Sequence, residues 1–229
     1  MASMEWPASD EVHVWSVELD RPAAHLARAL SEDELLRAAR YKVPDAGPRF
    51  VAARAALRTL LGRYLGHDPA ALRFAAGPQG KPRLDHPPSS LQFNVSHSAG
   101  VALIAVAPEM EVGIDIEEIK PRQDLAGLAR RVFTEREREA IALDEQSFYR
   151  HWVAKEAFVK ATGRGISSVR SFEVLLDAPG GARLVHVGGD AEEAARWTLA
   201  PLDAPAGYAA AVVVRGAGAT VKPTRAFEP

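Results

Sequence analysis

The sequence predicts an α+β fold made of two lobes of similar size. Each half of the 229-residue chain contains helical patterns together with strand-like patterns, and the strand-like segments of the second half are separated by Pro and Gly turns. Hydrophobic residues make up 47% of the chain, which is enough for a sizeable core. We expect lobes at residues 1–105 and 106–229, with a loosely ordered tail over 216–229.

The first half is expected to begin with a strand and two helices. Apolar residues alternate over residues 11–19, which predicts a half-buried strand. Ser31 precedes three acidic residues and so predicts the start of a helix that runs to about Tyr41. Residues 49–65 are rich in Ala, Leu and Arg, and they predict a second helix that ends near Gly66.

The middle of the chain is expected to change from loop to buried strands. Residues 77–90 are dense in Gly, Pro and polar residues and predict a loop. The run VALIAVAP at 101–108 is too apolar for an exposed edge and predicts a buried strand. Residues 111–119 repeat the strand character.

The second half is expected to hold two helical regions followed by strands. Residues 125–142 have an amphipathic helical pattern, and residues 148–162 predict a stronger helix that stops at Gly163. Four further segments predict strands: SFEVLL, ARLVHV, RWTLAPL and GYAAAVVV.

Composition limits the classes of partner. The formal net charge of −2 gives no reason to expect DNA or an anionic membrane. The chain has no cysteine, which excludes disulfides, thiolate metal sites and cysteine catalysis and fits the cytoplasm. We find no signal peptide and no stretch of the roughly 20 apolar residues that a membrane helix needs, so we expect a soluble protein.

Two carboxylates in a predicted strand indicate a cation site. Asp115 and Glu117 are two residues apart, so their side chains share one face while Ile114 and Ile116 enter the core. Two adjacent carboxylates raise each other's pKa, and a divalent cation that prefers oxygen ligands would neutralise them. The alternative is an exposed strand face with solvated acids.

A third carboxylate lies on the predicted helix at 148–162. Helical spacing places Trp152, Glu156 and Lys160 on one stripe, with Lys155 along its border. Such an acid and base are usually an exposed pair, but the tryptophan indicates that part of this face is buried. A buried Glu and Lys need partners, which a Mg²⁺-bound pyrophosphate would supply.

Several residues could hold an anion. The segment Asn94–Ser98 places short donors and His97 where a strand enters a turn, and side chains there can converge on phosphate oxygens. Lys81 lies between Gly80 and Pro82, which fix the loop. The basic residues on the preceding helices add charge: Arg37, Arg40 and Arg49. The alternatives are a structural histidine, a solvated loop lysine and ordinary surface arginines.

Three ordered motifs resemble those of a known family. FNVSHS at 93–98, VGIDIE at 112–117 and WVAKEAFVK at 152–160 resemble the signature motifs of the 4′-phosphopantetheinyl transferase superfamily. The length and the Arg-rich N-terminal helices are similar to its Sfp-type, two-lobed monomeric branch. GKPRL at 80–84 and RVFTEREREA at 131–140 support the resemblance, which covers roughly residues 11–214.

The resemblance implies a fold, a reaction and partners. It implies two α+β lobes related by a pseudo-twofold axis, with coenzyme A bound between them. The implied reaction transfers the 4′-phosphopantetheine of coenzyme A to a serine of an apo acyl or peptidyl carrier protein and releases 3′,5′-ADP. It further implies a monomer that uses Mg²⁺, with Mn²⁺ as a possible substitute.

The resemblance also implies roles for individual residues. The implied Mg²⁺ ligands are Asp115, Glu117 and Glu156. The implied catalytic residues are Glu156 as the first choice of base, Glu137 as the second, and Lys160 and His97 on the pyrophosphate. The implied coenzyme A contacts are Arg37, Arg49, Gly80, Lys81, Pro82, Ser96, His97, Lys155 and Lys160. Glu34 departs from the family pattern, which expects a lysine contact to the 3′-phosphate there.

Other functions and a docking surface remain open at this point. A carrier protein is expected to approach with an acidic helix, and exposed arginines could meet it: Arg130, Arg131, Arg136 and Arg138. These arginines could equally form pairs with neighbouring glutamates. The alternatives to the transferase are an inactive carrier-protein or nucleotide-binding module of the same fold and a Mg²⁺-dependent phosphohydrolase.

Overall fold

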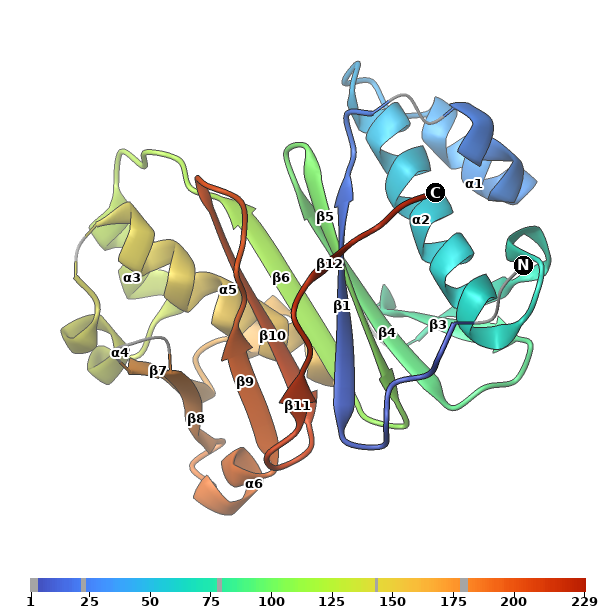
Figure 1. The fold of residues 1–229 in the computed structure, drawn as a ribbon. Helices are drawn as coiled ribbons and strands as arrows, with labels where there is room; N and C mark the ends of the chain where they lie inside the picture. Colours follow the sequence, from blue (N-terminus) through green and yellow to red (C-terminus); the bar gives the residue numbers. More distant parts are fainter. Residues whose placement is uncertain (1–3, 22–23, 78–79, 143, 178–180) are drawn as a thin grey trace.

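The computed structural model describes residues 4–21, 24–77, 80–142, 144–177 and 181–229. Its first sheet contains β1 (Glu11–Glu18), β5 (Val101–Pro108) and β4 (Leu91–Ser98), in that spatial order and antiparallel. Two short strands near the C-terminus, β11 (Thr220–Val221) and β12 (Arg225–Ala226), run parallel to β1. The sheet thus joins the two ends of the described chain (Figure 1).

Helix α2 (Ala46–Leu65) covers one face of this sheet, and α1 (Glu32–Ala39) lies beside it (Figure 1). Helix α1 begins at Ser31 with a capping box to Glu34, as the sequence predicts. Helix α2 ends at Gly66, whose φ of 64° is the left-handed conformation that glycine adopts without strain. Leu57, Leu60 and Leu61 of α2 are buried in one core cluster with side chains of the sheet.

The second sheet contains β6 (Val112–Glu118), β10 (Tyr208–Arg215) and β9 (Trp197–Pro201), all antiparallel. Helix α5 (Glu145–Thr162) packs along β6 and β10. The remaining elements of this half are α3 (Leu125–Val132), α4 (Glu135–Ala140), β7 (Phe172–Asp177), β8 (Gly181–Val187), the short helix η4 (Ile166–Ser168) and α6 (Ala191–Ala195). Two elements replace the single helical region that we predicted at 125–142, because Phe133 and Thr134 separate α3 from α4.

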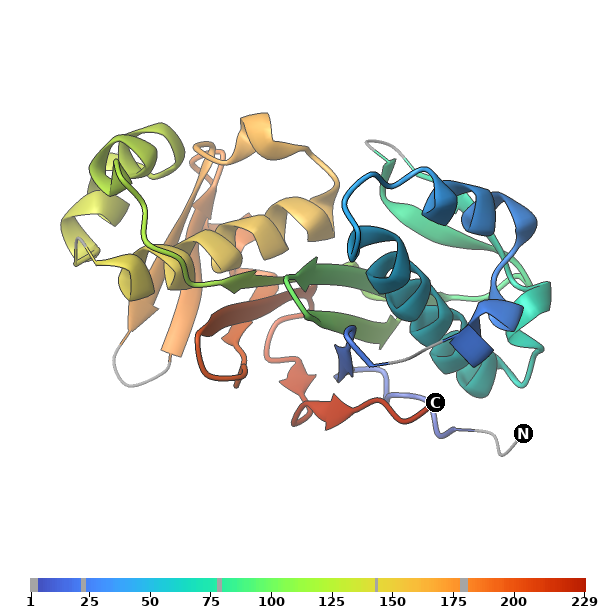
Figure 2. The ribbon, with the colours of Figure 1, turned by 90° about the horizontal axis from the view of Figure 1, so that it is seen from above.

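The two sheets pack against each other through their inner faces. Successive side chains of a strand point to opposite faces. On one face of β5 they pack against α2, and on the other face they pack against the second sheet. Leu103 and Ala105 of β5 share a core cluster with Ile114 of β6 and Val212 of β10. The layers therefore run helix, sheet, sheet, helix, and Figure 2 shows both halves from above.

The α+β class that the sequence predicts is confirmed. The division at residues 105 and 106 stays a prediction, and these two residues lie within the single strand β5. None of the described helices has the length and apolarity that crossing a membrane requires.

Two segments differ from expectation. The predicted loop at 77–90 contains β3 (Pro82–His86), which pairs with β2 (Arg73–Ala76) as a hairpin. The tail that we expected to be loosely ordered adds β11 and β12 to β1. It also buries Phe227 in the core cluster between α2 and the first sheet. Both are edge pairings of a few residues, which leave little alternation in the sequence.

Candidate active site

The site lies where β6 meets α5. Ile114 and Ile116 are buried in the core between the sheets, so Asp115 and Glu117 point the other way, toward α5. Gly113 allows α5 to come this close, because a Cβ at this position would lie 2.1 Å from the carbonyl oxygen of Ala157. The spacing that predicted one shared face for the two acids is present in the structure.

Lys160 of α5 bonds to side chains of two strands, β6 and β4. Its Nζ lies 2.6 Å from Oδ1 of Asp115 and 2.8 Å from Oγ of Ser96. Ser96 in turn donates its hydroxyl to Asp115 Oδ1 at 2.7 Å. Asp115 is 2% exposed, and burial raises its pKa although Lys160 and Ser96 oppose that rise. Three residues that the sequence assigned separately thus form one hydrogen-bonded group.

The three carboxylates act on one another, and we call Asp115, Glu117 and Glu156 the acidic cluster. Burial raises the pKa of Glu156, and the charges of Asp115 and Glu117 raise it further. Burial also raises the pKa of Glu117, against the bond that Ser98 Oγ donates to its Oε2 at 2.9 Å. A cation at this point would relieve the repulsion among all three groups.

The acidic cluster fits a hard divalent cation in its donor chemistry. All of its donor atoms are carboxylate oxygens, which Mg²⁺ prefers. Oδ2 of Asp115 is buried and has no hydrogen-bond partner among the residues that the structure describes. Within the described ranges, however, no three His, Cys, Asp or Glu side chains are gathered closely enough to hold a metal ion. The side chains therefore interact electrostatically without forming a closed coordination cage.

A cavity of about 500 Å³ adjoins this group on the side of the first half. His97, next to Ser96 in β4, lines it, as do Gly80 and Pro82 of the hairpin. Partial desolvation and the nearby charge of Lys160 lower the pKa of His97. Aromatic rings and guanidinium groups also line it: Arg37 lies 5.1 Å from the Phe50 ring centre and Arg54 lies 4.2 Å from that of Phe74. Such a wall suits a planar group that carries negative charge.

Glu34 is part of this wall and is paired there. Nε of Arg54 donates to Glu34 Oε1, and Nε of Arg58 donates to Oε2 at 2.7 Å. Burial alone would raise the pKa of Glu34, but these hydrogen bonds and one from the Ser31 amide lower it. The acid that departs from the family pattern is thus matched by two arginines that the sequence analysis did not single out.

Two predicted substrate contacts point elsewhere. Nζ of Lys81 donates to the carbonyl oxygens of Val112 and Ala161, at 2.9 and 3.0 Å. Arg49 forms a two-pronged pair with Asp20, at 2.6 and 3.1 Å, and is not among the residues that line the cavity. Neither side chain joins the group formed by Ser96, Asp115 and Lys160.

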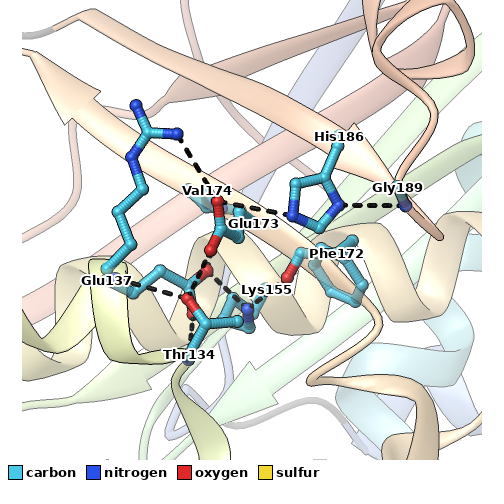
Figure 3. A network of polar contacts seen from close by, with 9 residues as sticks. Thr134, Glu137, Lys155, Phe172, Glu173, Val174, His186 and Gly189 are labelled. Carbon is cyan, nitrogen blue, oxygen red and sulfur yellow. Dashed lines mark hydrogen bonds and ion pairs between the residues drawn. The ribbon is translucent and has the colours of Figure 1, made fainter.

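Glu137 and Lys155 are not brought to the site either. They form a fully buried ion pair with each other between α4 and α5, as Figure 3 shows. Lys155 lies at the border of the predicted stripe, and its side chain points into the core of the second half. The sequence signal for such an outcome is the apolar surroundings of Lys155, since Val153, Ala154 and Ala157 flank it.

The sequence analysis also missed a contact between the halves. Strand β6 is an edge strand, and its outward amides need acceptors. The Ile114 amide donates to Asn94 Oδ1 at 2.9 Å, and the Glu118 amide donates to Ser98 Oγ at 3.0 Å. Polar residues at every second position of a buried strand were the available signal.

Comparisons with known proteins identify the family of this chain. A sequence model of the 4′-phosphopantetheinyl transferase superfamily matches residues 111–213, which include β6 and α5. The 4′-phosphopantetheinyl transferase HetI of Nostoc sp. is 41% identical over 220 residues, which cover 92% of this chain and 90% of that protein. A 4′-phosphopantetheinyl transferase of Bacillus subtilis is 32% identical over 182 residues, 73% of this chain and 78% of that protein. The transferase Sfp of the same species is 29% identical over 178 residues, with the same coverage of 73% and 78%. On these similarities, the chain belongs to the 4′-phosphopantetheinyl transferase superfamily.

Proposed function

We propose that this protein transfers the 4′-phosphopantetheine group of coenzyme A to a serine of an apo acyl or peptidyl carrier protein. The observation that carries the proposal is the acidic cluster with Lys160, next to a cavity walled by arginines and aromatic rings. A pyrophosphate substrate with a nucleotide at one end needs both features, since its phosphates carry charge and its base presents a flat apolar face.

The nucleotide end is assigned to the cavity. Phe74 and Phe50 offer ring faces, and Arg37 and Arg54 offer donors to a phosphate. Gly80 and Pro82 form the hairpin side of the same cavity, and His97 lines it near enough to Lys160 for that charge to lower the pKa of His97. The pyrophosphate would then lie between His97 and Lys160, where Lys160 can balance its charge and His97 can donate a hydrogen bond to it.

Mg²⁺ is proposed as the metal, held by Asp115, Glu117 and Glu156. Two observations support this assignment: Oδ2 of Asp115 has no partner among the described residues, and the pKa values of all three acids are raised. When bound, the ion would offset charge on the pyrophosphate and on the departing nucleotide. Mn²⁺ accepts the same oxygen ligands and should replace it in part.

Glu156 is our proposed base. Its carboxylate has no hydrogen bond among the described residues, so an oxygen that does not hold the metal is free to accept a proton. It would take the proton of the carrier serine as the serine oxygen bonds to the β-phosphorus of coenzyme A. The bond from that phosphorus to the bridging oxygen breaks, and 3′,5′-ADP leaves with the electron pair.

The carrier protein is proposed to contact the second half. Arg130 and Arg131 are exposed at the end of α3, where they could meet an acidic helix. Arg136 is less available because it faces Glu173 at 3.8 Å. Replacing Arg130 and Arg131 together with Ala should raise the KM for the carrier at unchanged KM for coenzyme A; an unchanged carrier KM would remove the docking assignment.

The absence of cysteine suits a reducing compartment, and we propose a monomer in the cytoplasm.

Intact mass spectrometry of a carrier protein tests the reaction. An apo acyl or peptidyl carrier is incubated with this protein, coenzyme A and Mg²⁺, beside an EDTA control and the variant Glu156→Ala. The variant Glu192→Ala, at an exposed position on α6, is the matched control. We expect the carrier to gain one phosphopantetheine with the wild type and with Glu192→Ala, and to gain none with EDTA or with Glu156→Ala. Binding of coenzyme A without any gain on several carriers would instead favour an inactive binding module.

A further inference from the structure

The buried pair of Glu137 and Lys155 has every polar atom occupied. Nζ of Lys155 lies 2.5 Å from Oε1 of Glu137, and both side chains are 0% exposed. The same ammonium donates to the carbonyl oxygen of Phe172 at 2.9 Å and lies 4.4 Å from the centre of the Phe172 ring. The Glu137 Oε1 atom also accepts from the Val174 amide at 2.8 Å. No atom of the pair is available to a substrate.

The pair connects three elements, which Figure 3 shows together. Glu137 closes a capping box at the start of α4, where its Oε2 accepts from the Thr134 amide at 2.8 Å. Phe172 and Val174 belong to β7, and Lys155 belongs to α5. Glu137 and Lys155 therefore tie α4 and β7 to one point on α5.

A contact of this kind is a poor source of stability. Two charges lose their hydration when they are buried, and the attraction between them rarely does more than offset that loss. Burial lowers the pKa of Lys155, while the charge of Glu137 opposes that change. What a buried pair supplies is a single permitted geometry, because each charge must meet its partner.

That geometry sets the orientation of α5. Lys155 precedes Glu156 directly, and Lys160 follows five positions later on the same rigid helix. Successive residues of a helix are turned by about 100°, so fixing the direction of Lys155 also fixes the directions of Glu156 and Lys160. Gly113 brings α5 directly against β6, and at this short separation Nζ of Lys160 lies 2.6 Å from Oδ1 of Asp115.

We propose that Glu137 and Lys155 are positioning residues that hold α5 so that Glu156 and Lys160 face Asp115. This inference rests on the proposed function for its catalytic readout. It gives Glu137 a role other than that of a base, and it gives Lys155 a role other than that of a coenzyme A contact. The shell around the pair consists of Thr134, which donates to Glu173, and of Arg136 and His186, which face that same Glu173.

A double-mutant cycle with steady-state kinetics tests the proposal. The variants are Glu137→Gln, Lys155→Met and the two combined, and the matched control is Val153→Ala, which makes a cavity in the same α5 core. Glu137→Gln leaves the buried Lys155 ammonium without a counter-charge, and Lys155→Met leaves the buried Glu137 carboxylate without one. Each single variant should therefore lower the Tm by roughly 10 °C. At a temperature where all variants are folded, each should lower kcat by about 10-fold to 100-fold, because small displacements of reacting groups are costly.

The combined variant is the decisive one. With both charges removed, we expect Tm and kcat to recover most of their loss, with the KM for coenzyme A within about threefold of wild type throughout. The control should lose Tm and keep kcat. A combined variant that is folded yet as inactive as the worse single variant would overturn the proposal, and so would a Lys155→Met enzyme with normal kcat and a greatly raised KM for coenzyme A.

Hydrogen exchange keeps the two proposals distinguishable. The amides of residues 145–162 should exchange faster in each single variant and slow again in the combined variant, with no substrate present. If the wild type modifies no carrier, the proposed function fails, while this exchange pattern and the Tm cycle still decide the positioning role. Unchanged exchange in the single variants would show that the pair does not hold α5.

Discussion

At the scale of single residues, the wall of the cavity shows how one acid can be accommodated among basic groups. Arg58 is 2% exposed and donates to Glu34 and to the carbonyl oxygens of Pro69 and Leu72. Arg54 meets the same carboxylate and lies over Phe74. Glu34 therefore organises two guanidinium groups instead of presenting its own charge to the cavity.

Removing this carboxylate should destabilise the protein. In Glu34→Ala the Arg58 guanidinium stays buried without its counter-ion, and the capping box at Ser31 is lost. We expect the free energy of unfolding to fall by about 3 kcal/mol. Urea denaturation measures this change, and Glu32→Ala, an exposed acid in the same first turn, is the control. Equal stability of the two variants would contradict the pairing.

His151 gives a prediction for pH. Its ring is buried against Phe133, and Nδ1 lies 2.9 Å from the Ser147 carbonyl oxygen. In the described part of the chain, Nε2 has no hydrogen-bond partner. Burial lowers its pKa, and the charges of Arg150 and Lys155 add to that effect while Glu137 opposes it. The unfolded chain therefore binds the proton first, so stability is complete above the ordinary pKa of 6.5 and is lost as the pH falls below it.

The measurement compares wild type with His151→Gln by urea denaturation from about pH 7 to about pH 5. The wild type should lose about 1.4 kcal/mol for each unit by which the folded pKa lies below the unfolded one. The variant lacks this loss, so the difference between the two proteins should shrink or reverse at low pH. Parallel curves over the whole range would show that His151 does not titrate between folded and unfolded states.

At the scale of elements, the position of α5 on β6 depends on Gly113. Replacing Gly113 with Ala adds a Cβ 2.3 Å from the Ala161 amide nitrogen and 2.1 Å from the Ala157 carbonyl oxygen, so the helix must move away. We expect a loss of about 3 kcal/mol in the free energy of unfolding, at the upper end of overpacking effects. Activity should fall more than stability alone explains, because Lys160 and Glu156 move with the helix.

The control for this variant is Val213→Ala. Val213 is the residue of β10 opposite Gly113, and its truncation leaves a cavity in the same core without a clash on α5. Thermal unfolding and carrier modification are measured for both. A Gly113→Ala protein whose activity matches that of Val213→Ala at equal stability would argue against a strict placement of α5.

The elements that the sequence predicts well are those with a clear period. The strand at 11–19 and the helix that ends at Thr162 follow from apolar spacing and from glycine stops, and the structure confirms them. The hairpin strand β3 has one weakly apolar face and pairs only with β2, so local composition looked like a loop. Tertiary pairing of short edges leaves no local signal.

The site is predicted from the sequence only where side-chain direction follows from the backbone. Asp115 and Glu117 lie two positions apart on one face of a strand, and Lys160 lies on the same helical stripe as Glu156. The sequence therefore predicted that these four side chains would interact. Lys155 lies only one position from Glu156, and whether it faces the substrate or the core depends on β7 and α4. Such long, flexible side chains choose among partners that only the fold supplies.

At the scale of the whole molecule, polar side chains join the two halves along the active site. Strand β4 of the first sheet sends Asn94, Ser96 and Ser98 to the edge of β6 in the second. Lys81, from the β2–β3 hairpin, makes a further contact across the same boundary. Because the bonds from β4 reach the strand that carries Asp115 and Glu117, they should affect both stability and the alignment of substrate groups from each half.

Lys81 permits a test of that connection. Its ammonium bonds to the carbonyl oxygen of Ala161 in the last turn of α5, where a helix favours positive charge, and to that of Val112 at the start of β6. In Lys81→Met both carbonyls lose a charged donor while the aliphatic stem is kept. We expect the protein without ligand to lose about 2 kcal/mol in the free energy of unfolding, since the donor is charged and partly buried.

Arg83→Met is the control, because Arg83 lies on the same hairpin, is exposed, and faces Asp85 at 3.5 Å. Urea denaturation of both variants is measured with and without coenzyme A. If Lys81 mainly joins the halves, its loss is the same in either condition, because the contact does not involve the substrate. If Lys81 instead bonds a phosphate of coenzyme A, the variant loses more stability with coenzyme A present than without it, relative to Arg83→Met. The first outcome follows from the contacts in the structure, and it makes Lys81 part of the boundary that the substrate must find already formed.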